Sequence, residues 1–186
     1  MSTKTELTEQ EFWALPEPDE GGYYELVNGQ AVQKVSPQYF HSSLQAALLL
    51  LIRDRVQGKG RIRPEWSVRL ELRGKRWIPC PDLTYISYER LPKTWKKNEP
   101  CPLPCDLAIE VISPDQTFKQ LEEKAKDYFA AGVLRVWVVD PEFMSITVFF
   151  PNGTRSVYAD DIKIIDALFP GLNLSVRQIF EEAELI

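Results

Sequence analysis

Residues 106–141 read DLAIEVISPDQTFKQLEEKAKDYFAAGVLRVWVVDP and contain a helical pattern between two apolar runs. The first run, 107–112, is short and rich in β-branched residues, which is typical of a strand buried on both faces. The pattern from about residue 117 to 131, ended by Gly132, predicts a helix, and the run 133–139 predicts another apolar strand. We therefore expect an α/β domain with a mixed central β-sheet flanked by helices.

One carboxylate, Glu110, lies in the middle of the first buried strand. Removing a lone carboxylate from water is costly unless a cation or hydrogen-bond donors meet it. Lys124 follows Leu121 by three residues and precedes Tyr128 by four, which puts it on or beside the inward face of the helix. Ala108, on the same face of the strand as Glu110, would leave room for the amine. We therefore expect Glu110 and Lys124 to form a paired site.

A second acid, Asp82, follows Pro81 at the start of another predicted strand, 81–86. Two acids on neighbouring strands, with an amine from the connecting helix, make a small cation site in which the lysine could hold a water or a phosphate. The residues alone leave an alternative open. Glu110 and Lys124 could form a buried ion pair and Asp82 could cap a strand end, with no metal present.

The N-terminal part of the chain predicts a hairpin and then a long helix. Asn28-Gly29 is a strong two-residue turn signal between strands over residues 23–27 and 30–35. A helix is expected from Ser36-Pro37 to about residue 57. Its predicted buried face consists of Phe40, Leu44, Ala47, Leu48, Leu51 and Ile52.

Local patterns also predict the remaining elements. Thr8 and Glu11 form a capping-box pattern that predicts a short helix after them. Alternating apolar residues predict one strand over residues 62–72, and the segment 88–105, rich in Pro, Lys and Trp, predicts a long exposed loop. The C-terminal part predicts structural or dimer-forming elements, namely strands over residues 145–150, 154–158 and 162–165 and a last helix over 175–182.

The charge distribution is uneven. The net charge is −5, but residues 31–139 hold 18 basic residues against 12 acids, and both ends are acidic. A basic middle would let a phosphate backbone approach from one side, although an ordinary solvated surface would show the same composition. The residues that we expect to contact nucleic acid are Arg61, Arg63, Lys96 and Lys97.

Length and composition indicate the broad class. With 186 residues, 44% of them hydrophobic, residues 1–186 are expected to form a single domain. No apolar window is long enough for a membrane span and no signal-peptide pattern is present, so we expect a cytoplasmic protein with no membrane partner. Three cysteines do not suggest a disulfide framework, and Cys101 and Cys105 lack the further ligands that a zinc site needs.

The ordered set of motifs resembles a known family, the Uma-two-type restriction endonucleases of the PD-(D/E)XK nuclease superfamily. No single motif is specific, but their order and spacing together are. The resemblance covers nearly the whole chain. It rests on Tyr24–Gly29, His41, Pro81-Asp82, Ile109–Pro114, Lys124, Tyr128, Gly132–Pro141, Phe169–Leu172 and Ile179-Phe180.

The resemblance implies a restriction-endonuclease-like core and a divalent-metal-dependent endonuclease that hydrolyses DNA phosphodiester bonds. Asp82 and Glu110 would be the metal-binding carboxylates, and the carbonyl of Val111 is expected to join them as a ligand. Hard oxygen ligands favour Mg²⁺, with Mn²⁺ as the other option. Lys124 would orient the attacking water or offset charge on the phosphoryl oxygens.

The resemblance also implies accessory groups. Glu25 would be the further acid from an N-terminal element, although a surface role is also open. His41 would lie near the site, although a lone histidine there is more often a helix-end residue. The superfamily usually carries its lysine where this chain has Ile112, and in this family the amine comes from the following helix, where Lys124 stands. Gln120 stands where relatives often have an acid.

Other functions remain open from the sequence. A non-catalytic nucleic-acid-binding or interaction domain could retain the same fold without turnover. A metal hydrolase other than a nuclease would share the ligands but gives no reason for the basic middle. By analogy with nucleases that cut both strands, we expect a homodimer.

Overall fold

The computed structural model describes residues 6–19, 21–34, 37–114 and 116–186. Within these residues the central sheet has six strands in the order β10-β9-β8-β7-β6-β3. Neighbouring strands are antiparallel except for β7 and β8, which are parallel. The predicted α/β class with a mixed central sheet is therefore confirmed. The strands are β3 (Gly60–Pro64), β6 (Leu83–Ser87), β7 (Leu107–Val111), β8 (Arg135–Asp140), β9 (Ser145–Phe149) and β10 (Arg155–Ala159).

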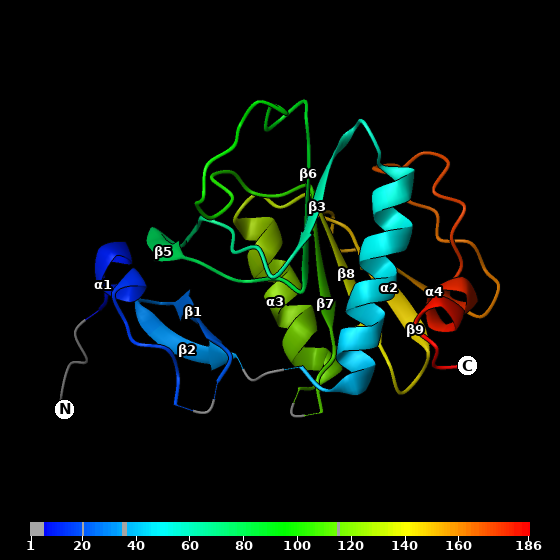
Figure 1. Ribbon diagram of the computed structural model, residues 1–186, viewed down its shortest axis with the longest axis horizontal. Coiled ribbons are helices and arrows are strands. Elements are labelled where there is room, and N and C mark those ends of the chain that lie inside the picture. Colours follow the sequence, from blue (N-terminus) through cyan, green and yellow to red (C-terminus); the bar gives the residue numbers. More distant parts are fainter. Residues whose placement is uncertain (1–5, 20, 35–36, 115) are drawn as a thin grey trace.

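Helices cover both faces of this sheet (Figure 1). Helix α3 (Phe118–Ala130) connects the parallel strands β7 and β8 and packs on one face. Helices α2 (Tyr39–Arg55) and α4 (Val176–Glu182) lie together on the other face. Such a crossover helix is the usual way to join two parallel neighbours, and it brings α3 against β7.

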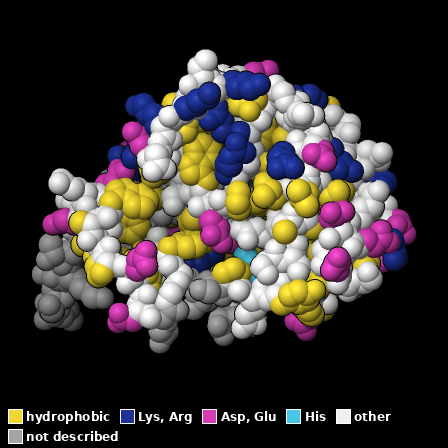
Figure 2. Space-filling model, in the orientation of Figure 1, with side chains coloured by type: hydrophobic (Ala, Val, Ile, Leu, Met, Phe, Trp, Pro, Cys, Tyr) yellow, Lys and Arg dark blue, Asp and Glu magenta, His cyan; other side chains and the backbone are white. Residues whose placement is uncertain are grey.

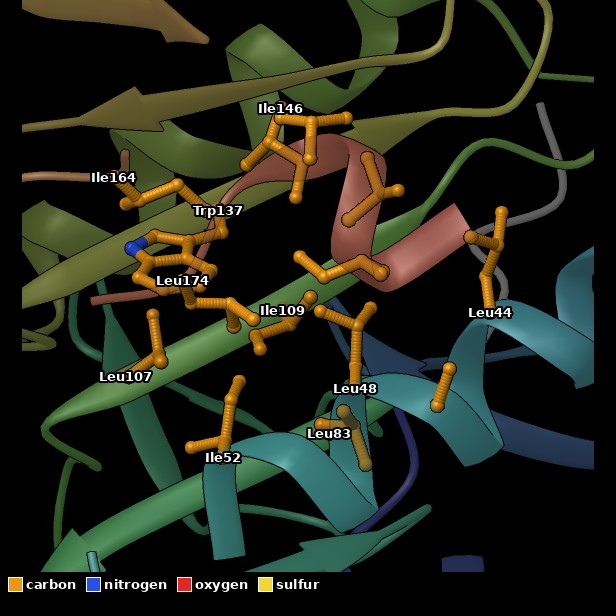
Figure 3. Close-up of a cluster of buried hydrophobic side chains, with 14 of the residues drawn as sticks. Leu44, Leu48, Ile52, Leu83, Leu107, Ile109, Trp137, Ile146, Ile164 and Leu174 are labelled. Carbon is orange, nitrogen blue, oxygen red and sulfur yellow. The ribbon is translucent and has the colours of Figure 1, made fainter. Parts of the chain in front are cut away.

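Two apolar layers hold the helices to the sheet. Side chains of α2 and α4 meet Ile109 and Trp137 in one layer (Figure 3), and α3 packs on Ala108 and Val138 in the other. Because successive residues of a strand point to opposite faces, Glu110 shares the α3 face with Ala108. The strand alternation therefore aims Glu110 at α3.

Two small hairpins and a short helix lie beside the central sheet (Figure 1). They are α1 (Glu9–Trp13), with the predicted Thr8–Glu11 capping box, β1 (Tyr23–Val27) with β2 (Gln30–Lys34), and β4 (Leu70–Leu72) with β5 (Lys75–Trp77). Leu26 and Ile78 exchange both backbone hydrogen bonds, at 3.1 and 2.9 Å. This bridge connects the β1–β2 hairpin to the segment that leads into β6.

Two strand predictions are wrong. The strand expected over residues 62–72 is interrupted because β3 ends at Pro64 and Glu65 adopts a left-handed backbone with φ of 47°. The chain turns there, and β4 belongs to a separate two-stranded sheet. The strand expected over 162–165 forms only one isolated bridge, between Lys163 and Ser175.

The start of the long helix also differs from the prediction. Helix α2 begins at Tyr39, with Gln38 as its N-cap, and Ser36 lies outside the described residues. Phe40 was expected on the buried face but is 57% exposed. Its helical turn extends beyond the apolar layer, whose α2 residues begin at Leu44.

No helix in the described part of the chain has the length and apolarity that a membrane crossing requires.

All three cysteines are buried and free, which predicts low reactivity in the native state. Burial raises the pKa of Cys80 and of Cys101 to about 11, and that of Cys105 well above its ordinary value. Since the thiolate is the nucleophile, we expect native protein at about pH 8 to react with DTNB far more slowly than urea-unfolded protein, and faster as the pH rises toward 11. Rapid labelling of native protein at about pH 8 would contradict this.

Candidate functional site

The register between β6 and β7 brings Asp82 and Glu110 together. Leu83 pairs with Ile109 in an antiparallel ladder, so the residue before Leu83 lies beside the residue after Ile109. Both carboxylates are buried, with 1% of Asp82 and 2% of Glu110 exposed. The Nζ atom of Lys34 lies 2.5 Å from Asp82 Oδ1 and 3.8 Å from Glu110 Oε2. One ammonium therefore joins the two acids.

Asp82 is held by three groups from different elements. Besides Lys34, His41 Nε2 on α2 lies 3.0 Å from Asp82 Oδ2, and the Val111 N–H donates to the same oxygen at 2.6 Å. Burial opposes ionisation of Asp82, but Lys34 and His41 outweigh it and lower its pKa to about 2. Asp82 is therefore an oriented carboxylate rather than a mere strand-end cap.

Glu110 is held by α3. Its Oε1 accepts a hydrogen bond from the Tyr128 hydroxyl at 2.7 Å and lies 3.0 Å from Lys124 Nζ. Burial of Lys124 opposes its charge, but Glu110 and Glu25 outweigh that effect and raise its pKa. The helical spacing of Lys124 predicted this pairing with Glu110, and the structure brings the two groups together.

Glu25, from β1, completes the cluster. Lys124 Nζ lies 3.1 and 3.3 Å from its two carboxylate oxygens, and the Cys80 N–H donates to Glu25 Oε1 at 2.8 Å. Glu25 is only 8% exposed, so the alternative of a surface role does not hold. His41 is likewise a buried partner of Asp82 rather than an isolated helix-end residue.

Lys34 is a site residue that was not predicted from the sequence. It is the last residue of β2, and alternation puts it on the same side of the hairpin as Val32, which is 48% exposed. It therefore resembled a surface lysine, but the hairpin register pairs Val32 with Glu25 and so puts Lys34 on the same face as that candidate acid. Burial works against its charge, but Glu110 and Asp82 raise its pKa well above the ordinary value. Lys34 is therefore charged at neutral pH.

Two other predicted features have clear positions. The N–H of Val111 donates to Asp82 Oδ2, and the Val111 carbonyl remains a predicted ligand. Gln120, at a position where an acid was noted in relatives, forms a capping box with Thr117 at the start of α3. Its side chain therefore serves the helix end and contributes no charge to the Lys124 pair.

A pocket of about 660 Å³ adjoins the cluster at His41. Its walls come from the first turns of α2 and α3 and from the segments that follow β7 and β8, and include Phe40, Ser113, Thr117 and Phe143. Asp82, Glu110 and Lys124 do not line it. The carboxylates are thus near a substrate-sized hollow but are covered by other side chains.

The four predicted nucleic-acid contacts gather in a second pocket, of about 380 Å³, with Trp66 and Trp95. Arg63, Lys96 and Lys97 are exposed. Arg61 is engaged differently, because its guanidinium donates to the carbonyls of Trp95 and Pro92 at 2.9 and 2.8 Å. Arg61 therefore fixes the loop 88–105. Figure 2 shows Lys and Arg side chains gathered over β3 and this loop.

The donor chemistry of the cluster partly fits a divalent cation. Carboxylate oxygens of Asp82 and Glu110 are the hard ligands that Mg²⁺ and Mn²⁺ prefer. The space between them, however, is taken by Lys34 Nζ. Among the described residues, no group of three or more His, Cys, Asp and Glu side chains is arranged to hold a metal. The oxygens therefore suit a metal, while the present arrangement already pairs them with an ammonium.

Comparison with known proteins gives a family and a fold. A crystal structure described as a "putative nuclease belonging to DUF820", from Anabaena variabilis ATCC 29413, is similar with a TM-score of 0.79 at 23% identity, over 94% of this chain and 97% of that chain. No curated protein matches. The family model Uma2, described as "Putative restriction endonuclease", matches residues 9–177. The fold and the family are thus those described for nucleases, as the motifs indicated, and the chain belongs to the Uma2 family.

Proposed function

We propose that this protein is a divalent-metal-dependent endonuclease that hydrolyses DNA phosphodiester bonds. The observation that carries the proposal is the convergence of Asp82 and Glu110 from neighbouring strands with Lys124, whose Nζ lies 3.0 Å from Glu110 Oε1. Two carboxylates and an amine so arranged suit phosphoryl chemistry, and the family description agrees with this.

The chain's own groups have distinct roles in this proposal. Asp82 and Glu110 would hold the cation, with the Val111 carbonyl as the further predicted ligand. When bound, the cation supplies Lewis acidity to the scissile phosphate. Lys124 orients the attacking water or donates to a phosphoryl oxygen as negative charge builds there. It can do so because its charge is kept by Glu110 and Glu25.

Other residues act by positioning the carboxylates. His41 and the Val111 N–H hold Oδ2 of Asp82, and the Tyr128 hydroxyl holds Oε1 of Glu110. Partners of this kind fix the orientation of ligand side chains and typically matter about 10- to 100-fold for metal affinity or activity. The proposed accessory residues are thus His41 and Glu25, with Tyr128 added.

DNA would approach along the basic pocket at β3. Arg63, Lys96 and Lys97 are exposed there and suit backbone phosphates, and the rings of Trp66 and Trp95 could stack on unpaired bases. We further propose that residues 1–186 act as a single domain in the cytoplasm. A homodimer would allow both strands to be cut.

The proposal is tested by incubating supercoiled plasmid with the protein in Mg²⁺ or Mn²⁺ and, in parallel, in EDTA. We expect nicked and linear products with divalent cation and none in EDTA. Absence of products with either cation would contradict the proposal.

The alternative is a non-catalytic nucleic-acid-binding or interaction domain. One observation favours it, because the described carboxylates at the site are paired with the ammonium groups of Lys34 and Lys124. A gel shift of DNA together with no cleavage in either cation would support this alternative.

A further inference from the structure

The ammonium of Lys34 lies in a cage of three oxygens. It is 2.5 Å from Asp82 Oδ1, 3.0 Å from the Cys80 carbonyl and 3.8 Å from Glu110 Oε2. Two of these oxygens belong to the carboxylates that would hold a divalent cation. A cation coordinated between Asp82 Oδ1 and Glu110 Oε2 would fall in the volume that Nζ fills.

We propose that Lys34 is a tethered cation that occupies the divalent-cation position, and that a metal ion binds only after Lys34 withdraws from Asp82 and Glu110. The inference rests on the proposed function, because it concerns the metal site of that activity. It adds that the metal-free protein carries its own competitor for the metal.

The charges of the cluster support an exchange. Three carboxylates, Glu25, Asp82 and Glu110, face the two ammonium groups of Lys34 and Lys124, so these five groups carry one net negative charge. Without Lys34 the net charge would be two negative, which a divalent cation neutralises. Replacing the Lys34 ammonium with a divalent cation therefore takes the net charge of these groups from one negative to zero, whereas withdrawal of Lys34 alone would leave two negative charges buried.

The exposed fractions of the three side chains also support an exchange of Lys34 for a cation. The side chain of Lys34 is 13% exposed, whereas those of Asp82 and Glu110 are 1% and 3% exposed. Lys34 is therefore the most exposed of the three side chains and is among the groups that cover the acids. Its withdrawal would both free the oxygens and admit water and a phosphate.

The position of Lys34 in the fold permits this movement. It ends β2, which pairs with β1 in a hairpin outside the central sheet. Asp82 and Glu110, by contrast, are held by the β6–β7 ladder. A change in the lysine side chain or the hairpin end can thus open the site without moving the two acids.

The test compares Mn²⁺ binding to the parent and to the full-length Lys34→Met variant by isothermal titration calorimetry and thermal melting. Lys34→Met should melt at a lower temperature in EDTA, because Asp82 loses its ammonium. It should bind Mn²⁺ at least about 10-fold more tightly than the parent does, and Mn²⁺ should raise its melting temperature by more. The reason is that only the fraction of parent molecules in which Lys34 has withdrawn can bind Mn²⁺, which lowers the apparent affinity of the parent. Mn²⁺ affinity in Lys34→Met equal to or weaker than that of the parent would overturn the inference.

Two further variants sharpen the result. Lys126→Met removes an exposed lysine paired with Glu123 and should leave Mn²⁺ affinity unchanged. Lys34→Gln keeps a hydrogen-bond donor but not the charge, and it serves if Lys34→Met does not fold. If the parent binds Mn²⁺ as tightly as the Lys34 variants do, only the Lys34 inference is overturned. No Mn²⁺ binding by the parent or by either Lys34 variant overturns the metal-dependent function as well.

Discussion

Plasmid cleavage by the Asp82→Asn variant is expected to fall by about 100- to 1,000-fold, because the amide removes the charge that would hold the cation against the scissile phosphate. Asn has nearly the same shape as Asp, so packing between His41 and Val111 changes little. The measurement is the initial rate of nicking of supercoiled plasmid in Mg²⁺, with thermal melting to establish that the variant is folded.

Asp127→Asn is the matched control for this variant. Asp127 lies on α3, and its carboxylate pairs with the exposed guanidinium of Arg73 rather than with a group of the cluster. The nicking rate of the Asp127→Asn variant should equal that of the parent protein. An Asp82→Asn protein that nicks DNA as fast as the parent would remove Asp82 from the proposed metal site.

Lys124→Met is expected to lower both activity and stability. Nicking should fall about 100- to 1,000-fold, because a donor to the charge developing on the phosphoryl group is lost. The free energy of unfolding should fall by about 3–5 kcal/mol, since buried Glu25 and Glu110 lose their shared ammonium. Plasmid nicking and urea denaturation measure the two effects.

Two variants separate these effects. Lys124→Arg keeps the charge but not the compact geometry of the ammonium, so stability should recover more than nicking does. Lys119→Met alters an exposed lysine of the same helix and should change neither quantity. Full nicking activity in Lys124→Met would exclude this lysine from the mechanism.

The Lys34 proposal relates the two interpretations that the sequence left open, a metal site and a buried ion pair. In the structure, Lys124 pairs with Glu110, as the ion-pair alternative expected, and also with Glu25. Asp82, which that alternative made a strand-end cap, pairs with Lys34. In the proposed active state, a divalent cation takes the position of Lys34. Under the Lys34 proposal, these ion pairs include the one that the cation would replace at Asp82 and Glu110.

Much of the fold followed from local pattern. The β7-α3-β8 unit was predictable because its strands are continuous apolar runs and its helix has a cap at each end. The hairpin at Asn28-Gly29 was predictable because that pair adopts the positive φ values its turn needs, here 50° and 73°. The break after β3 was missed, because the alternation of apolar residues continues through Glu65 and does not record its backbone turn.

The pairing of Glu110 with Lys124 was also predictable. A charged residue in an apolar run must find a partner, and helical spacing put Lys124 on the facing side. Lys34 carried no such signal, since it ends a half-exposed hairpin strand.

Sequence periodicity thus specified which face each residue of a strand or helix presents, because that depends only on neighbours within a few positions. It could not specify that Lys34 meets Asp82, 48 residues further along the chain. That contact depends on where the β1–β2 hairpin docks, through the Leu26–Ile78 bridge, against the segment before β6. Docking of separate elements is a property of the packed molecule, and here it places a cation between the two acids.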